Sequence, residues 1–302
     1  MTGAYHTPVL AGTVARLGQG RRRVVDGTLG GGGHAALFLE AGASVLGVDR
    51  DPEALGAARH RFATQRIHYV QGSFGEVHVL AAIEAFQPDL VLLDLGVSSR
   101  QLDADPRGFS FRPGVPLDMR MSGSGATAAD LLNSLPQPEL RELFGRNADE
   151  RRAGRLARAI VERRMRAPLT ISDDLVGAIR RALGPRTGPA DFARLFQAVR
   201  IAVNDELDTL AGALDPLRLR LVPGGLLVAI AYHSGEDRIV KQAFRDWASA
   251  CRCPPGQPVC TCAGAYGRVL TRRPVQADGD EVAGNPRARS ARLRAFEVAD
   301  GA

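Results

Sequence analysis

The segment that most constrains the fold is residues 24–34, which read Val-Val-Asp-Gly-Thr-Leu-Gly-Gly-Gly-Gly-His. A short apolar strand runs into a glycine-rich turn, and a helix follows. A second predicted strand ends at Asp49, 23 residues after Asp26. In doubly wound nucleotide-binding sheets the glycines let the backbone approach a ligand, and an acid at the end of the second strand binds ribose hydroxyls. The segment therefore predicts an α/β fold built on a Rossmann-like, doubly wound sheet.

The glycine spacing alone leaves the ligand open. A dinucleotide site uses a Gly-x-Gly-x-x-Gly turn around a pyrophosphate, whereas this turn opens with Asp26 and Thr28. An acid at the strand end would repel a diphosphate but suits a cationic ligand. S-adenosylmethionine carries an ammonium and a sulfonium and no phosphate, so we favour it over NAD. A turn whose glycines serve only packing is the remaining alternative.

Composition is that of a globular protein with an excess of arginine. The 302 residues are 45% hydrophobic, enough for one large domain or two modest ones. Net charge is +6, and Lys241 is the single lysine. Arginine makes planar, bidentate contacts with phosphates, so a nucleic-acid partner is plausible, with a plain preference for arginine over lysine as the alternative. We expect a cytoplasmic protein that does not contact a membrane, since neither a secretory signal nor a membrane-length apolar run is visible.

Strands and helices alternate along the first hundred residues, which predicts a parallel sheet. We expect strands at 23–26, 44–49, 67–71 and 89–95, with helices at 34–41, 52–63 and 75–85 between them. The sheet resumes at 226–232, and a last strand is predicted at 292–298.

Between the fourth and fifth strands the alternation stops for about a hundred residues. Helical patterns cover 127–183, and apolar spacings of three and four predict one long helix over 190–214. We expect an S-adenosylmethionine-binding sheet domain formed by 1–104 and 205–302, and an inserted all-helical domain at 105–204. Such an insert is well placed for substrate recognition; a long crossover packed only as scaffold is the alternative.

Asp94 ends the fourth predicted strand, where α/β folds place reacting groups. The small residues that follow it, including Ser98 and Ser99, leave room for a flat ligand. A carboxylate there can accept a hydrogen bond from an exocyclic amine and then its proton, which makes Asp94 the candidate catalytic residue. Capping a turn or holding the cofactor are equally open roles for it.

Two further regions carry candidate substrate contacts. In the loop after Asp94, three arginines could hold phosphates and two phenylalanines could stack a base, although such loops are often plain surface. These residues are Arg107, Arg112, Arg120, Phe109 and Phe111. His233 leaves the fifth strand, where it is either a site residue or a structural hydrogen-bonding group.

The four cysteines fall within twelve residues, as Cys251, Cys253, Cys260 and Cys262. Four thiolates can close a tetrahedral zinc site, although the usual spacing within each pair is two residues and here it is one. A structural zinc is one interpretation, and free or redox-active thiols are the other.

These motifs together resemble one family, the bacterial 16S rRNA cytosine-N4 methyltransferases known as RsmH or MraW. The resemblance spans nearly the whole chain, and the motifs occur in the family's order. The matching segments are residues 6–10, 26–30, 32–34, 49–52, 94–99, 101–103, 107–111, 116–121, 196–207, 236–241 and 285–294. This chain departs from the family's usual Phe-His-Ser-Leu at Tyr232 and Gly235, and from its usual Thr at Leu195.

The resemblance implies S-adenosylmethionine as donor and, as acceptor, the decoding-centre cytosine at position 1402 of 16S rRNA in the small ribosomal subunit. It implies that Asp49 holds the ribose hydroxyls and that Phe74 lies near the adenine. The full set of implied cofactor contacts is Gly32, Gly33, His34, Asp49, Phe74, Asp94 and Gln101. A DNA amino-methyltransferase and a non-catalytic cofactor-binding factor in ribosome assembly are the alternatives that we keep.

Overall fold

A computed structural model describes residues 8–97, 107–251, 253, 257, 259, 261 and 264–300. The chain divides into two compact units. A sheet unit comprises Met1–Gly96 and Leu207–Ala302, and a helical unit comprises Val97–Glu206. None of the helices in the described ranges is both long and apolar enough to cross a membrane.

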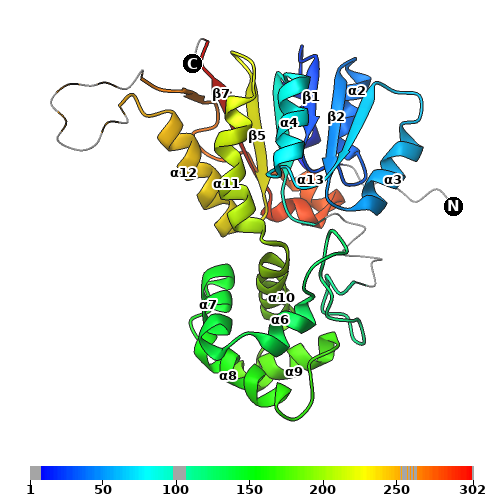
Figure 1. Ribbon diagram of the computed structural model, residues 1–302, viewed down its shortest axis with the longest axis vertical. Coiled ribbons are helices and arrows are strands. Elements are labelled where there is room, and N and C mark those ends of the chain that lie inside the picture. Colours follow the sequence, from blue (N-terminus) through cyan, green and yellow to red (C-terminus); the bar gives the residue numbers. More distant parts are fainter. Residues whose placement is uncertain are drawn as a thin grey trace. The chain divides into compact units, whose positions relative to one another are not determined.

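The sheet unit contains a seven-stranded sheet of order β3-β2-β1-β4-β5-β7-β6 (Figure 1). The first five strands of that order are parallel, whereas β7 runs antiparallel to β5 and to β6. The predicted doubly wound sheet is therefore confirmed. The strands are β1 (Arg23–Asp26), β2 (Ser44–Asp49), β3 (Ile67–Gln71), β4 (Leu90–Asp94), β5 (Leu226–Ala231), β6 (Gly267–Val269) and β7 (Arg292–Val298).

Helices cover both faces of this sheet because successive strand residues point to opposite sides. Val25 and Val91 pack into a cluster with α4, α11 and α12, whereas Val24 and Leu90 pack into a cluster with α1, α2 and α3. The helices of this unit are α1 (Ala11–Leu17), α2 (Gly33–Glu40), α3 (Pro52–Arg61), α4 (Val77–Phe86), α11 (Glu206–Leu219), α12 (Ser234–Trp247), α13 (Gly279–Gly284) and the 3₁₀ turn η1 (Pro286–Ser290).

The helical unit surrounds a separate apolar core. Leu132, Phe144, Leu156 and Ile179 are fully buried in it, one from each of four successive helices. Its helices are α6 (Ala128–Ser134), α7 (Gln137–Ala148), α8 (Ala153–Arg164), α9 (Ser172–Leu183) and α10 (Pro189–Asn204).

The prediction of one long helix over 190–214 is wrong. α10 ends at Asn204, Asp205 adopts a left-handed backbone with φ of 49°, and α11 begins at Glu206. The helical spacing of apolar residues continues across the break, so the spacing does not predict where α10 ends. An aspartate tolerates the left-handed region better than most residues, which makes Asp205 a suitable place to end a helix.

The break at Asp205 gives a stability prediction. The side chain of Asp205 is exposed, so substitutions there act mainly through the backbone. We expect Asp205→Gly to raise the free energy of unfolding by up to about 1 kcal/mol and Asp205→Ala to lower it by a similar amount, because only glycine adopts positive φ freely. Urea unfolding of both variants checks this; a shift of the same sign in both would contradict it.

Candidate functional site

Four strands of the sheet unit end in polar side chains at one edge of the sheet. Because β1, β2, β4 and β5 are parallel, their carboxyl ends lie along the same edge. The residues there are Asp26, Asp49 and Asp94 at the last positions of β1, β2 and β4, and Tyr232 directly after β5. This edge is the candidate site, and the glycine turn between β1 and α2 borders it.

The glycine turn is tied to two neighbouring strands. The Gly27 N–H donates to the carbonyl of Leu92 at 2.8 Å, and the Leu29 N–H donates to the carbonyl of Val48 at 2.9 Å. Gly32 precedes α2 with φ of 71°, and a Cβ there would lie 2.4 Å from the ring of Phe62. A side chain at position 32 is therefore excluded both by backbone conformation and by packing.

Asp49 binds the turn back to the second strand. Its Oδ2 accepts a hydrogen bond from the Gly30 N–H at 2.7 Å, and its Oδ1 accepts one from the Asp51 N–H at 2.8 Å. A carboxylate has about four acceptor positions, so each oxygen keeps capacity for another donor. The arrangement fits the predicted role of Asp49 toward a pair of hydroxyls.

Asp26 and His34 are buried beside the same edge, with 1% and 5% of their surfaces exposed. Burial raises the pKa of Asp26 to about 6, against the opposing effects of His34 and of the Thr28 N–H. Burial alone would lower the pKa of His34, but its interactions with Asp94 and the charge of Asp26 outweigh burial and raise it. Both shifts favour the protonated form of the side chain concerned.

Asp94 lies at the centre of this group. Its Oδ1 accepts a hydrogen bond from the Tyr232 hydroxyl at 2.8 Å, and its Oδ2 lies 3.4 Å from Nε2 of His34. Its own N–H donates to Oγ1 of Thr28 at 2.6 Å. The Asp94 side chain is 25% exposed, so the carboxylate is held in one orientation while remaining accessible.

Sequence reasoning assigned no site role to Tyr232. It lies partly buried at the end of β5, and its pKa is raised by burial and by the nearby charge of Asp94. The available signal was its position: a hydroxyl that follows a central parallel strand comes to the same edge as the acid that ends the adjacent strand.

His233 has a clear structural role. Its Nδ1 accepts the Gly235 N–H at 3.1 Å at the start of α12, and its Nε2 lies 3.2 Å from Oε1 of Glu236. A Cβ at Gly235 would lie 3.0 Å from the imidazole. A side chain at position 235 would therefore need a small shift of the ring, and nothing in the structure explains why glycine replaces the family's usual leucine here.

Phe74 is buried in the apolar cluster beneath the site edge, with Val25 and Leu93. Gly33, the first residue of α2, packs against Pro8, since a Cβ there would lie 3.2 Å from that ring.

The loop arginines predicted to hold phosphates are engaged within the helical unit. Arg107 donates to the carbonyls of Arg120 and Met121 at 3.3 and 3.2 Å, and Arg112 donates to Ser110 at 3.2 Å. Arg120 makes a bidentate pair with Asp118 at 2.8 and 2.7 Å.

Burial leaves Phe109 no free face for a base, whereas Phe111 is only partly buried, so base stacking by Phe111 stays a prediction. Phe109 is buried in the core of the helical unit. Phe111 packs against Phe192 and Phe196, with ring centroids 5.8 and 6.2 Å apart. Apolar loop residues thus supply the core of a small helical unit.

Several predicted residues fall outside the described residues: Ser98, Ser99, Gln101, Cys260 and Cys262. Cys251 is exposed, and the Sγ of Cys253 accepts a hydrogen bond from the Thr261 N–H at 3.3 Å. No group of three metal-ligating side chains occurs within the part of the chain that the structure describes. The structural zinc therefore stays a prediction.

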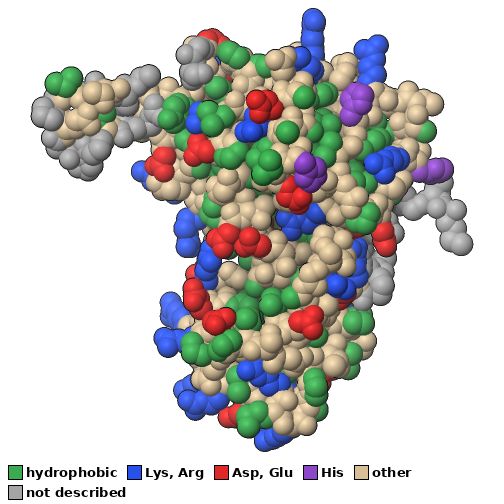
Figure 2. Space-filling view, viewed as in Figure 1, with side chains coloured by type: hydrophobic (Ala, Val, Ile, Leu, Met, Phe, Trp, Pro, Cys, Tyr) green, Lys and Arg blue, Asp and Glu red, His purple; other side chains and the backbone are tan. Residues whose placement is uncertain are grey.

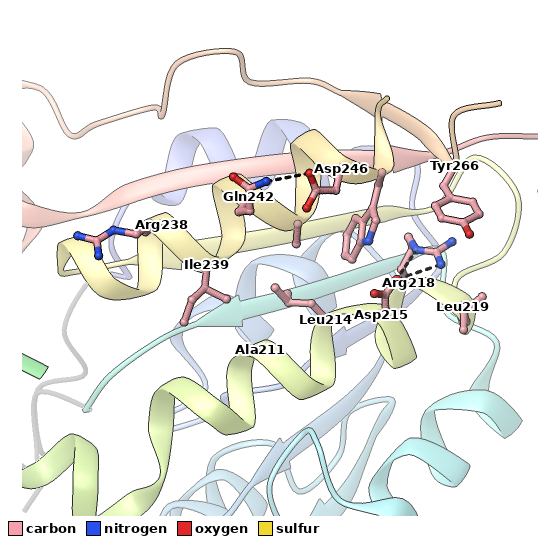
Figure 3. A pocket seen from close by; sticks show the side chains of 12 residues that line it. Ala211, Leu214, Asp215, Arg218, Leu219, Arg238, Ile239, Gln242, Asp246 and Tyr266 are labelled. Carbon is pink, nitrogen blue, oxygen red and sulfur yellow. Dashed lines mark hydrogen bonds and ion pairs between the residues drawn. The ribbon is translucent and has the colours of Figure 1, made fainter. Parts of the chain in front are cut away.

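A groove of about 850 Å³ lies between α11 and α12 (Figure 3). Arg218 is its most buried charge: it pairs with Asp215 at 3.1 Å and lies 3.9 Å from the ring centroid of Tyr266. None of the predicted site residues lines the groove. Because Arg218 already pairs with Asp215 and packs on Tyr266, the edge of the sheet remains the better candidate for the functional site.

Comparison with known proteins shows the family of this chain. Residues 3–299 match the model of the MraW methylase family. A ribosomal RNA small subunit methyltransferase H from Gemmatimonas aurantiaca is 53% identical, over 99% of this chain and 96% of that protein. Proteins of the same name from Anaeromyxobacter sp. and Heliobacterium modesticaldum are 48% and 42% identical, each over 97% of this chain. The chain belongs to the MraW methylase family.

The raised pKa of Asp26 predicts a pH-dependent stability. Because folded Asp26 binds its proton more tightly than an unfolded aspartate of pKa 3.8, its contribution to stability is present below pH 3.8 and is lost as the pH rises through about 6. Between pH 4 and 7 we expect wild type to lose up to about 3 kcal/mol relative to Asp26→Asn. Urea unfolding across this range measures the difference; a difference that stays constant with pH would contradict the assignment.

Proposed function

We propose that this protein transfers a methyl group from S-adenosylmethionine to the exocyclic N4 of the cytosine at position 1402 of 16S rRNA. The observation that carries the proposal is the Asp94 carboxylate, oriented by Tyr232 and His34 at the strand edge beside the glycine turn. The names of the relatives, which are small-subunit rRNA methyltransferases, support the RNA class of the substrate.

The residues at the edge fit the donor. Asp49 has acceptor capacity left for ribose hydroxyls, and three acids at the edge suit a cation. Nδ1 of His34 is buried without a hydrogen-bond partner among the described residues, which is the kind of atom that a bound ligand satisfies. We propose Gly32, Gly33, His34, Asp49, Phe74, Asp94 and Gln101 as its binding residues. When bound, S-adenosylmethionine supplies a methyl group already activated by its sulfonium.

Asp94 is the proposed catalytic residue. Since Tyr232 and His34 face one oxygen each, the carboxylate keeps lone pairs in a fixed direction for the N4 amine. Accepting a hydrogen bond from the amine favours its attack, and accepting its proton completes the transfer. The competing role is to anchor the amino group of the donor, and kinetics separate the two roles.

The acceptor-binding residues stay a proposal. Ser98, Ser99, Arg107, Arg112, Arg120 and His233 form the proposed set, and the helical unit is the proposed substrate-recognition domain. The bonds of Arg107 and Arg120 shape the loop in which they lie. We therefore expect them to act chiefly by fixing that loop. An assembled small subunit is the proposed physical substrate, acted on in the cytoplasm.

The direct test incubates the protein with labelled S-adenosylmethionine and small ribosomal subunits that lack the modification. Nucleosides from the digested RNA are then identified by mass spectrometry. N4-methylcytidine at one site supports the proposal. No incorporation by protein that binds the donor in a control titration favours a non-catalytic assembly factor, and incorporation into DNA alone favours a DNA amino-methyltransferase.

Asp94→Asn tests the catalytic role with an isosteric change. The amide still accepts the Tyr232 hydroxyl hydrogen bond, so we expect a folded protein. Loss of the proton acceptor should lower kcat by about 100-fold or more. Calorimetric titration with S-adenosylmethionine distinguishes the roles: weaker donor binding at unchanged kcat would assign Asp94 to anchoring, and full activity would exclude both.

Tyr232→Phe removes one hydroxyl and keeps the ring. A hydrogen bond to a carboxylate contributes about 1.5–3 kcal/mol to stability, so its loss should lower the melting temperature. Because the same bond orients Asp94, kcat should also fall about tenfold or more. Steady-state kinetics on small subunits measures this. Unchanged kcat would mean that Asp94 keeps its orientation without Tyr232.

A further inference from the structure

The most basic segment of the helical unit surrounds α8. Residues 151–166 contain seven arginines and one acid, Glu162. Figure 2 shows basic side chains on the surface of this unit, over the region where Figure 1 labels α7 and α8.

Three of the seven arginines make structural bonds. Arg152 donates to the carbonyl of Leu183 at 3.0 Å, and Arg163 pairs with Asp174 at 2.5 Å. Arg164 donates to the carbonyls of Leu132 and Leu135 at 3.0 and 2.8 Å. These side chains connect α8 to its neighbours.

The other four arginines point into solvent. Arg151, Arg155, Arg158 and Arg166 are exposed, and their side chains make no hydrogen bond or ion pair with any described residue. We call these four residues the α8 arginine stripe. Arg141 of α7 is also exposed, and its side chain lies beside Gly154 of α8.

Two residues of the stripe lie on α8, and two flank it. Residues three and four apart share a face of a helix, so Arg155 and Arg158 lie together on α8, whereas Arg151 lies in the turn before α8 and Arg166 in the turn after it. Leu156 and Ile160 are buried in the core of the unit. Glu162 shares the arginine face, but it pairs with Arg181 at 2.7 Å, so its charge is already matched. Among the described residues, no ion pair joins a stripe arginine to an acid.

An unmatched stripe of this kind has a cost. Like charges three and four residues apart destabilise a helix by about 0.2–0.5 kcal/mol per pair. Guanidinium groups give bidentate hydrogen bonds to phosphate, and several of them along one helix match a chain of regularly spaced phosphates. By contrast, the loop arginines that the sequence predicted to bind phosphate already donate hydrogen bonds to other groups of the protein.

We propose that the α8 arginine stripe binds the phosphate backbone of the RNA substrate. The proposal rests on the function proposed above and adds a surface to it. Such contacts position a nucleic acid and contribute affinity that depends on salt, without reading its sequence.

The test replaces Arg155 and Arg158 together by Gln. The matched control replaces Arg66 and Arg245, two exposed and unpaired arginines of the sheet unit, so both variants lose the same charge. Binding to unmethylated small subunits and to protein-free 16S rRNA is measured between 50 and 200 mM KCl. Each lost phosphate contact should reduce the slope of log affinity against log salt by about 0.7–0.9.

We expect the stripe variant to lose a total slope of about 1.5 and to bind both RNAs about tenfold more weakly near 150 mM KCl. Its KM for subunits should rise while kcat and donor affinity stay unchanged, and the control should shift far less. Equal effects in both variants, or no effect in the stripe variant, would overturn the proposal. A loss on subunits alone would assign the stripe to a ribosomal protein and also overturn it.

Binding and methylation separate the two proposals. If wild type binds RNA through the stripe but transfers no methyl group, the proposed function fails and the stripe stands. If wild type methylates subunits and the stripe variant keeps the same KM, the stripe fails and the function stands.

Discussion

The hydrogen bond between the Tyr232 hydroxyl and Asp94 joins the ends of the two central strands, and the geometry of the site depends on it. The same aspartate contacts Thr28 of the glycine turn through its backbone and His34 of α2 through its side chain. One residue thus connects β4, β5, the turn and α2. Its orientation is fixed before any ligand arrives, which is the condition under which a polar group stabilises a transition state most effectively.

Much of this fold could be predicted from the sequence because its signals are local. Strong alternation of apolar strands with helices located β1, β2, β3 and β7 to the residue. The break at Asp205 could not be found, since the apolar spacing runs through it and a left-handed backbone at an aspartate leaves no distinct pattern. The strand β6 has only three residues, too few to show an alternation of apolar and polar side chains. It forms by pairing with the free edge of β7.

The site was predictable in its strand-end acids but not in its partners. Asp49 and Asp94 were located by their position at strand ends. The contact of Tyr232 with Asp94 joins residues 138 positions apart and depends on the order of strands in the sheet. The burial of Phe109 was missed because a loop with aromatic residues looks the same in sequence whether the rings face solvent or a core. In the helical unit, likewise, only the structure shows which arginine side chains bond to other described residues and which do not.

The contact between Gly32 and Phe62 has a consequence for how this chain can change. A residue with a side chain at position 32 would need a left-handed backbone and, at the same time, a smaller group at position 62. A side chain at position 32 is therefore tolerated only together with a smaller residue at position 62, so the two positions are coupled although they lie thirty residues apart. The packing of Phe62, directly after α3, thus restricts substitution in the glycine turn independently of any ligand. A library that varies position 32 alone should yield almost no folded variants other than glycine.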